Sequence, residues 1–298
     1  MQIRPAVPDD APAVVALRAL VYPYLVRGVE STRQMIANPP PGEEWVAFVA
    51  EHAGRVVGWV SAYVNARTAE PGFGEISLLH VHPEHRGRGT GTALLTLARE
   101  HVLRLDARRI RAWAQAESLG FARRHGFEPG RELRYSSLAL RPAPPAPTVP
   151  AGVELAPLTD LTPELMYAAE VAAASDEPED APQDAIPFES WRYDVWDNIG
   201  LDRDASVAVL VDGEVVAFSL VKRDGERMWS DMTATRPEYR GRGLARLAKR
   251  GALHRAAERG VTVAYTSNDE ANAPMLAVNA RLGYRPIAAQ WSCLASVG

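Results

Sequence analysis

The sequence has a single cysteine and no long uncharged apolar run, and both absences narrow what the chain can be. With Cys293 alone, no intramolecular disulfide can form and the usual thiolate cages of zinc are excluded. Nowhere do about 18 uncharged apolar residues follow one another, and the N-terminus has no apolar core of a secretory signal. We therefore expect a protein of the reducing cytoplasm that does not enter a membrane.

An excess of positive charge is also missing. The formal net charge is -4, so the chain has no surplus of cations with which to neutralise the phosphates of DNA or RNA. We expect no nucleic-acid partner, and small substrates become the better hypothesis.

The length and the prolines indicate two domains. A chain of 298 residues, 47% of them hydrophobic, suits two domains of roughly 150 residues each. Residues 141–150 are dense in proline, which is typical of a semi-rigid extended linker. We predict a domain at 1–142, a linker at 143–150 and a second domain at 151–298.

Both halves show the same order of patterns. Each begins with a short strand and a helix, continues with a hairpin and a third strand that ends at proline, and then has a glycine-rich loop and an amphipathic helix. A strand, a helix and a Gly-aromatic pair close each half, at a nearly constant offset, which indicates a duplicated domain. The predicted third strands are 75–82 and 228–235, and the closing pairs are Gly126-Phe127 and Gly283-Tyr284.

The two glycine loops carry the strongest chemical signal. Both have the pattern Arg-x-x-Gly-x-Gly/Ala just before a helix. Small residues let successive N–H groups converge, and the helix start adds its positive dipole end, so a pyrophosphate is the natural occupant. The residues are Arg86, Gly87, Arg88, Gly89, Thr90 and Gly91 in the first loop, and Arg240, Gly241, Arg242, Gly243, Leu244 and Ala245 in the second. A glycine-rich turn with solvated arginines is the alternative for a single copy, and the repetition weighs against it. Neither loop has the glycine order of a dinucleotide fold or the Gly-Lys-Ser/Thr of a Walker loop.

These residues resemble the pyrophosphate-binding motif of the GNAT N-acetyltransferase superfamily. The resemblance implies an α/β (α+β) protein of two GNAT-type domains. Each would have a mixed, mostly antiparallel sheet of six to seven strands, with a splayed central strand pair and flanking helices. It also implies acetyl-CoA as the cofactor, whose pantetheine arm would bind to free backbone groups of Leu79 and Val81 in the first half, and of Thr233 and Thr235 in the second. An arrangement of two fused copies is known within this superfamily, in mycothiol synthase-like proteins.

The second half resembles the family further. Residues 268–284 look like the second family motif, in which asparagines follow a strand and a helix ends on Leu-Gly-aromatic. The resemblance places Asn268, Asn272 and Asn279 at the cofactor, while helix capping is the alternative for the first two. The first half keeps the Gly-aromatic ending without the asparagines, so we expect the main catalytic site in the second domain.

The resemblance implies acetyl transfer from acetyl-CoA to an amine by direct attack in a ternary complex. Glu75 stands where many relatives have a glutamate base, with a surface carboxylate as the alternative. Trp229 occupies that position in the second half, so Asp231, two residues on and on the same side of the strand, is the candidate base there, with a structural hydrogen-bonded carboxylate as the alternative. In the family a tyrosine protonates the leaving thiolate, but that position holds Ala122 in the first half and Asn279 in the second. Tyr265 or a water is therefore the candidate proton donor, unless the thiolate leaves without assistance.

The acceptor stays open between a small-molecule and a peptide amine. Residues 175–184 are acidic and precede several aromatic residues, which suits a cationic acceptor, although a solvated loop beside core aromatics is the preferred interpretation. His80, His82 and His85 do not form a fixed cluster by spacing, and we expect no metal. Cys293 is expected to pack in a terminal strand.

A module that binds acyl-CoA without turnover is the competing function, and monomer and homodimer are both compatible with the sequence.

Overall fold

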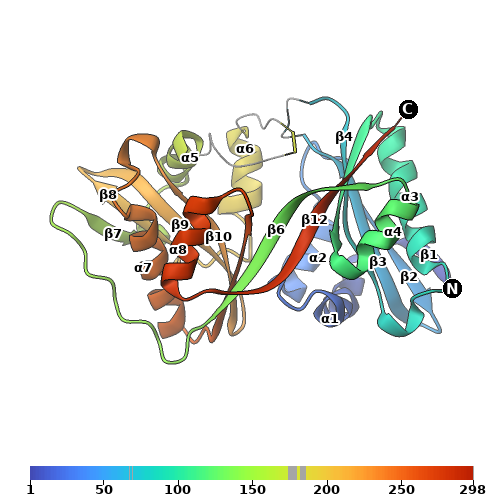
Figure 1. The fold of residues 1–298 in the computed structure, drawn as a ribbon, viewed down its shortest axis with the longest axis horizontal. Helices are drawn as coiled ribbons and strands as arrows, with labels where there is room; N and C mark the ends of the chain where they lie inside the picture. Colours follow the sequence, from blue (N-terminus) through green and yellow to red (C-terminus); the bar gives the residue numbers. More distant parts are fainter. Residues whose placement is uncertain (67, 69, 174–179, 182–185, 298) are drawn as a thin grey trace. The chain divides into compact units, whose positions relative to one another are not determined.

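The computed structural model describes residues 1–66, 68, 70–173, 180–181 and 186–297. The chain forms two compact units (Figure 1). Unit 1 contains Met1–Leu133, Glu179–Ala185 and Ala289–Gly298, and unit 2 contains Arg134–Pro178 and Ile186–Ala288. Each unit is described separately below.

Unit 1 follows the predicted order of elements and adds a second early helix. Its strands and helices are β1 (Gln2–Pro5), α1 (Ala11–Val21), α2 (Val29–Ala37), β2 (Val46–His52), β3 (Arg55–Val64), β4 (Phe73–Val81), α3 (Thr90–Arg104), β5 (Arg109–Gln115), α4 (Leu119–Arg124) and the start of β6 (Glu128–Ala139).

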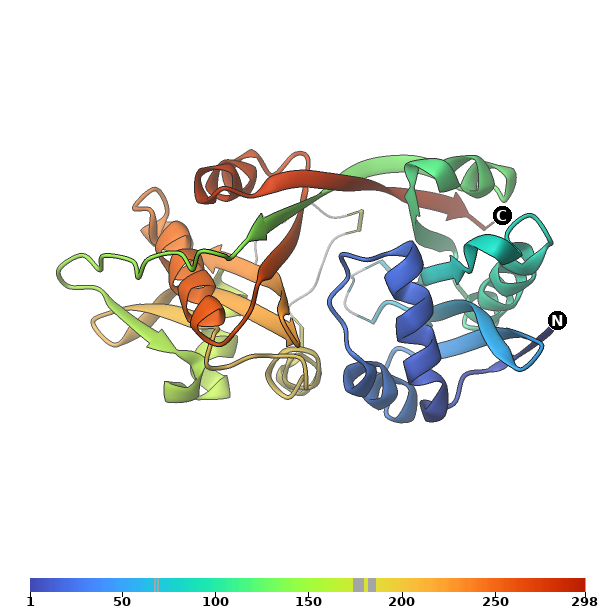
Figure 2. The same cartoon turned by 90° about the horizontal axis from the view of Figure 1, so that it is seen from below.

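The sheet of unit 1 is covered on both faces by helices. Its strands run in the order β1-β2-β3-β4-β5, and β12 follows β5. Side chains alternate along a strand, so Val49 and Trp59 pack with Val14 of α1, while Ala50 and Val60 belong to the core that contains α3. Figure 2 shows α1 in dark blue in front of these strands. The pairs β1–β2, β2–β3 and β3–β4 are antiparallel, and β4–β5 is parallel.

Unit 2 repeats this plan. Its elements are the second part of β6, β7 (Glu154–Pro157), α5 (Pro163–Ala173), α6 (Phe188–Trp191) with a π-helical turn at Arg192–Trp196, β8 (Val207–Val211), β9 (Glu214–Asp224), β10 (Arg227–Thr235), α7 (Leu244–Glu258), β11 (Val263–Asp269), α8 (Ala273–Leu282) and the start of β12 (Arg285–Ser296).

The sheet of unit 2 has the order β7-β8-β9-β10-β11, and β6 follows β11. Alternation again separates two cores. Ala208 and Phe218 pack with Trp191 and the α5 side chains, whereas Val209 and Val216 pack with Leu244 of α7. As in unit 1, only the central pair, β10–β11, is parallel among the pairs β7–β8, β8–β9, β9–β10 and β10–β11.

Strands β6 and β12 each supply residues to both units. Residues 128–133 of β6 belong to unit 1 and 134–139 to unit 2, while 285–288 of β12 belong to unit 2 and 289–296 to unit 1. In unit 1, Gln290 to Ser296 pair antiparallel with β5, and Cys293 and Ala295 are buried in the core. Unit 2 thus begins at Arg134, and unit 1 takes residues from the closing strand β12.

The structure confirms the predicted fold class of two duplicated α/β units with mostly antiparallel sheets and flanking helices. Each unit has a long helix directly after its glycine loop, and a one-turn 3-10 helix lies before each loop, at Pro83–His85 and Pro237–Tyr239. Within the described residues, no helix combines the length and hydropathy that a membrane crossing needs.

Deleting the chain after Ala288 should destabilise unit 1, although the deleted residues lie at the far end of the sequence. The truncation leaves β5 as an unpaired edge and removes two side chains from the core of unit 1, a loss of at least about 2 kcal/mol. Hydrogen exchange should accelerate at Arg109–Gln115 and its neighbours and stay slow in β8–β10. Ile287→Ala, at an exposed position of β12 in unit 2, is the control. Unchanged protection in unit 1 would refute the role assigned to β12.

Candidate active site

The central strands of unit 2 separate after their first three residues. Strand β10 pairs with β11 only from Arg227 to Trp229, opposite Val263 to Tyr265. Beyond this point β10 continues to Thr235 and β11 to Asp269. The β9–β10 register shifts between Ser230 and Thr233. The shift turns β10 locally and accompanies its divergence from β11.

The diverging part of β10 directs backbone groups into the gap. The N–H of Arg236 donates to Val216 of β9 at 2.9 Å. Because backbone groups alternate along a strand, Ala234 also faces β9, and Thr233 and Thr235 face away from it. These are the two residues whose backbone the resemblance assigns to the pantetheine arm. That contact stays a prediction.

The loop after β10 leads directly into α7. Gly243 is the N-cap of α7, with φ +78, and no side chain caps the first turn. A Cβ at Gly241 or Gly243 would meet no protein atom within 4 Å, so the space above the loop is open. Arg240 fixes the loop to the strand, since its Nε donates to the Thr235 carbonyl at 3.2 Å. An open cradle of N–H groups at a helix start fits a pyrophosphate.

Unit 1 has the same backbone geometry. The β4–β5 ladder ends at Ile76 and Ala112, and β4 continues to Val81. The N–H of His82 donates to Val57 at 2.8 Å, which places Leu79 and Val81 on the side away from β3. Arg86 donates from Nε to the Val81 carbonyl at 3.3 Å. Gly89 has φ +81 at the start of α3, and the space around it is open.

A cavity of about 250 Å³ lies in unit 2 where the strands separate. It is lined by side chains from β10, β11 and the two helices that follow the motifs. The lining residues are Trp229, Ser230, Asp231, Met232, Thr233, Lys249, Ser267, Asn268, Asn272 and Met275. A second hollow, of about 710 Å³, lies around Asp197–Asp204 and the β9–β10 turn. That turn is at the opposite end of β10 from the glycine loop, so the smaller cavity is the candidate site.

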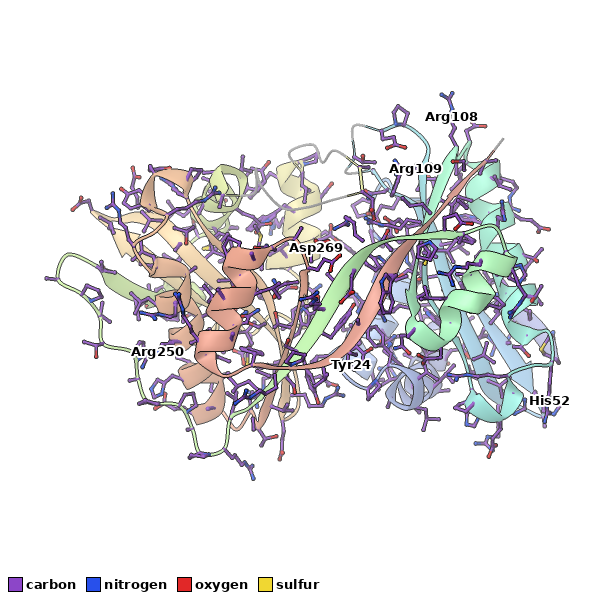
Figure 3. The ribbon with its side chains drawn as sticks, viewed as in Figure 1. Tyr24, His52, Arg108, Arg109, Arg250 and Asp269 are labelled. Carbon is purple, nitrogen blue, oxygen red and sulfur yellow. The ribbon has the colours of Figure 1, made fainter. Side chains whose placement is uncertain are left out.

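Two of the three asparagines, Asn268 and Asn272, line this cavity, and Asn279 is bonded to the first of them. Asn272 caps α8, because its Oδ1 accepts the Met275 N–H at 3.2 Å. Asn279 is 3% exposed and donates from Nδ2 to Asn268 Oδ1 at 2.5 Å. Asp269, labelled in Figure 3, ends β11 and accepts the N–H of Ala271 at 2.8 Å. The capping role of Asn272 is therefore present, while a direct contact of these asparagines with the cofactor stays a prediction.

The two catalytic candidates of unit 2 have different surroundings. Asp231 lines the cavity and forms an ion pair with Lys222 of β9, at 2.8 Å between Oδ2 and Nζ. Tyr265 lies on β11 opposite Trp229, and the Arg227 guanidinium stacks 5.3 Å from its ring centre. Tyr265 is not among the residues that line the cavity.

Glu75, the candidate base of unit 1, is held by an arginine. It is 3% exposed and accepts two hydrogen bonds from Arg111, at 2.5 Å from Nη2 and 3.2 Å from Nε. Arg111 also pairs with Asp180, which contacts Arg131 at 2.9 Å and accepts from Ser292 Oγ at 2.5 Å. The alternative of a surface carboxylate is excluded, since Glu75 is buried in an ion-pair network.

Asp180 is the anionic centre of this network. Burial would raise the pKa of Asp180, but the hydrogen bonds from Arg131 and Ser292, with Arg111, lower it to about 2. Asp180 belongs to the acidic stretch 175–184 for which the sequence suggested an acceptor wall. Residues 175–179 and 182–184 of that stretch lie outside the described residues.

The sequence reasoning missed Lys249. This lysine of α7 lines the cavity and is 1% exposed, with its amine 5.1 Å from the ring centre of Tyr284. Burial lowers the pKa of Lys249 to about 7. The helical period could have revealed it, because Lys249 falls on the same face as Ala245, Ala252 and Ala256.

Of the three histidines considered for a metal, His80 is enclosed and His82 lies at the loop. Burial, with the charges of Arg18 and Arg86, lowers the pKa of His80 to about 3. His82 Nδ1 accepts the N–H of Glu84 at 3.3 Å. Among the described residues, no group of three or more His, Cys, Asp or Glu is arranged to hold a metal ion.

The fold and both loops define a tandem GNAT protein, and comparison with known proteins shows the same family. The model of the acetyltransferase (GNAT) family matches residues 15–127 and again 166–284. The chain belongs to this family. Both matches include a glycine loop and the helix after it.

Curated relatives extend over both units. A mycothiol acetyltransferase of Streptomyces bingchenggensis is 28% identical over 266 residues, covering 86% of this chain and 82% of the relative. One from Amycolatopsis mediterranei is 31% identical over 263 residues, covering 82% and 81%. Among solved structures, a tandem GNAT protein from the clavulanic acid biosynthesis pathway has a TM-score of 0.76 at 22% identity, covering 100% and 98% of the two chains. A GCN5-related N-acetyltransferase from Sphaerobacter thermophilus has a TM-score of 0.72 at 23% identity, covering 99% and 95%.

Asp180→Asn should destabilise unit 1 in a pH-dependent way. Because the folded-state pKa of Asp180 is lowered to about 2, its carboxylate stabilises the fold by about 2 kcal/mol above pH 4 and loses this contribution as pH falls towards 2. Denaturant unfolding of wild type and variant from pH 7 to pH 2 should show a difference that shrinks with acid. Glu70→Gln, which removes a half-exposed pair with Arg109, should cost under about 1 kcal/mol. A pH-independent difference would mean that packing, and not charge, explains the effect.

Gly243→Ala should weaken CoA binding, whereas the same substitution at a glycine of similar φ in a hairpin turn should not. The added methyl group would occupy the cradle and strain a residue at φ +78, raising the Kd by at least about tenfold. Gly213→Ala is the matched control, because Gly213 has φ +81 in a hairpin turn with open space around it. Isothermal titration with CoA measures both variants. If Gly213→Ala weakens CoA binding equally, the weaker binding of Gly243→Ala would result from a less stable fold and not from a change in the glycine loop.

Proposed function

We propose that this chain transfers an acetyl group from acetyl-CoA to the amine of a small molecule, and that unit 2 is the main catalytic site. The observation that carries the proposal is the cavity between the separated ends of β10 and β11, on the strand that leads into the Arg240 loop. Family membership supports acetyl transfer, and the mycothiol acetyltransferase relatives support a small-molecule acceptor.

Each part of unit 2 has a role in this proposal. The N–H groups of the loop at Gly241, Gly243 and Ala245 hold the pyrophosphate, with Arg240 and Arg242 adding positive charge. Thr233 and Thr235 hold the pantetheine arm through the backbone groups that face away from β9. The thioester then lies between the strands, where the cavity is.

The reaction exchanges a carbon–sulfur bond for a carbon–nitrogen bond. The neutral amine attacks the thioester carbonyl carbon, the bond to sulfur breaks with its electron pair on sulfur, and the nitrogen loses one proton while the sulfur gains one. Asp231 is placed to accept the nitrogen proton, directly or through a water, because it lines the cavity. Its pair with Lys222 orients the carboxylate. Asp231 would also attract a cationic acceptor.

Unit 1 is proposed to bind cofactor or to support the fold without turnover. Its loop has the same geometry as the loop of unit 2, so it can hold a pyrophosphate. Glu75, however, already accepts two hydrogen bonds from Arg111 and is 3% exposed, which leaves it poorly placed to take a proton from an amine. The same contrast supports the second candidate function, an acyl-CoA-binding module, for unit 1 alone.

We also propose a reducing compartment, the cytoplasm, for this protein. Cys293 is a buried free cysteine with its pKa raised to about 11 by burial. A thiol of this kind is a packing residue with little thiolate character, and no disulfide is available to stabilise the fold.

Activity is tested by release of CoA thiol from acetyl-CoA in the presence of amino sugars, polyamines, amino acids and peptides. Asp231→Asn should lower kcat by about 100-fold or more for the amine that reacts, since general base catalysis contributes factors of this size. Asp224→Asn, an exposed carboxylate at the end of β9, should leave kcat unchanged. Silence on every amine, with CoA binding intact, would favour the binding module over the enzyme. Equal loss of kcat from Gly89→Ala and Gly243→Ala would overturn the assignment of catalysis to unit 2.

A further inference from the structure

Lys249 is a buried amine for which no described residue supplies a carboxylate partner. It lies on α7 with 1% of its surface exposed. Among the described residues, its amine contacts the face of the Tyr284 ring, 5.1 Å from the ring centre, and forms no ion pair. Burying a cation without a partner is unfavourable. Stability therefore gives no reason for a lysine here, where a methionine would fill the same space.

The chain has very few lysines, and both lie at or beside the cavity of unit 2. The sequence contains 33 basic residues, and only Lys222 and Lys249 are lysines. Lys249 lines the cavity of unit 2, and Lys222 pairs with Asp231, which lines the same cavity. Arginine stays protonated at any pH the protein meets, whereas a lysine can release a proton when it is buried. Both lysines thus lie where a transferable proton would matter.

The other groups of the cavity do not supply that proton. Ser230, Ser267, Thr233, Asn268 and Asn272 carry hydroxyls and amides, which do not ionise near neutral pH. Asp231 is a proton acceptor in its pair with Lys222. Of the described side chains that line the cavity, Lys249 alone is both a cation and able to donate a proton.

We propose that Lys249 is the proton donor to the sulfur of CoA as the thiolate leaves, and this rests on the proposed acetyl transfer in unit 2. As the carbon–sulfur bond breaks, its electron pair goes to sulfur and a proton moves from Lys249 Nζ to sulfur. The amine of Lys249 is left neutral. Asp231 passes the proton of the acceptor amine to water, and Lys249 regains a proton from water, so the cycle is balanced.

The surroundings of Lys249 suit this role. Burial lowers its pKa to about 7, so donation to a thiolate is close to balanced near neutral pH. Of the titratable groups nearby, Tyr284 has a pKa raised by burial, Asp231 is paired with Lys222, and Asp269 of β11 accepts a backbone N–H. On its own helix, Arg246 and Arg250 stay charged.

The first test compares Lys249→Met, Lys249→Arg and the control Arg250→Met. Lys249→Met should keep or raise the Tm and keep the Kd for CoA within about twofold, while kcat falls by about 100-fold. In wild type, kcat should decline as pH rises through about 7, where Lys249 loses its proton. Lys249→Arg should lose kcat as well, because a guanidinium keeps the charge but does not release a proton near neutral pH. A lower Tm with kcat unchanged in Lys249→Met would overturn the proposal.

The second test needs no acceptor and so separates this inference from the proposed function. CoA labelled with ¹³C next to sulfur reports the ionisation of its thiol by NMR while bound. An ammonium beside the sulfur should lower the pKa of the bound thiol by about 1 unit or more in wild type relative to Lys249→Met. That shift, in a protein that acetylates no amine, would support the role of Lys249 and refute the proposed function. If the protein acetylates an amine but the bound thiol has the same pKa in wild type and in Lys249→Met, the proposed function is supported and the role of Lys249 is refuted.

A third outcome is covalent. If the neutral amine of Lys249 attacks the thioester itself, acetyl-CoA alone will acetylate it. The two lysines of the chain make this simple to map by peptide mass spectrometry. Stoichiometric acetylation of Lys249 would overturn its role as proton donor.

Discussion

The candidate site depends on one constraint, the separation of two neighbouring parallel strands. Where β10 leaves β11 beyond Trp229, each strand keeps its other neighbour, so the sheet holds together while a row of backbone groups remains open. Such groups are costly to leave without partners. A ligand with an extended chain of amides can supply the missing partners, which explains why the loop, the cavity and the buried lysine all lie along this gap.

The two units show how one backbone design can carry different chemistry. Both have an arginine that bonds back to the last strand carbonyl and a glycine that begins the long helix. Their third strands differ in what surrounds the carboxylate: Glu75 is enclosed by Arg111, whereas Asp231 borders a cavity and has a single lysine partner. Both units thus keep the same loop geometry, while the carboxylates of their third strands have different surroundings.

Local features were predictable from the sequence, and long-range ones were not. The loops were found because positive φ at Gly89 and Gly243 is a local demand that only small residues meet easily. The partner of β12 could not be read from its residues, since alternation shows which side of a strand is buried and not which strand lies beside it. Asp180 reaches Arg111 across 69 residues of sequence, and no short pattern marks such a pair. Lys249 could have been identified from the sequence, because it is a charged residue on the apolar face of a predicted helix.

The placement of β12 also determines when unit 1 can be completed during synthesis. The ribosome delivers residues 1–133 long before residues 289–296, so the edge of β5 stays without its β12 neighbour while the intervening residues are made. The usual order, in which the N-terminal domain finishes first, cannot apply here. Until residues 289–296 have been made, the nascent chain presents β5 as an unpaired strand edge.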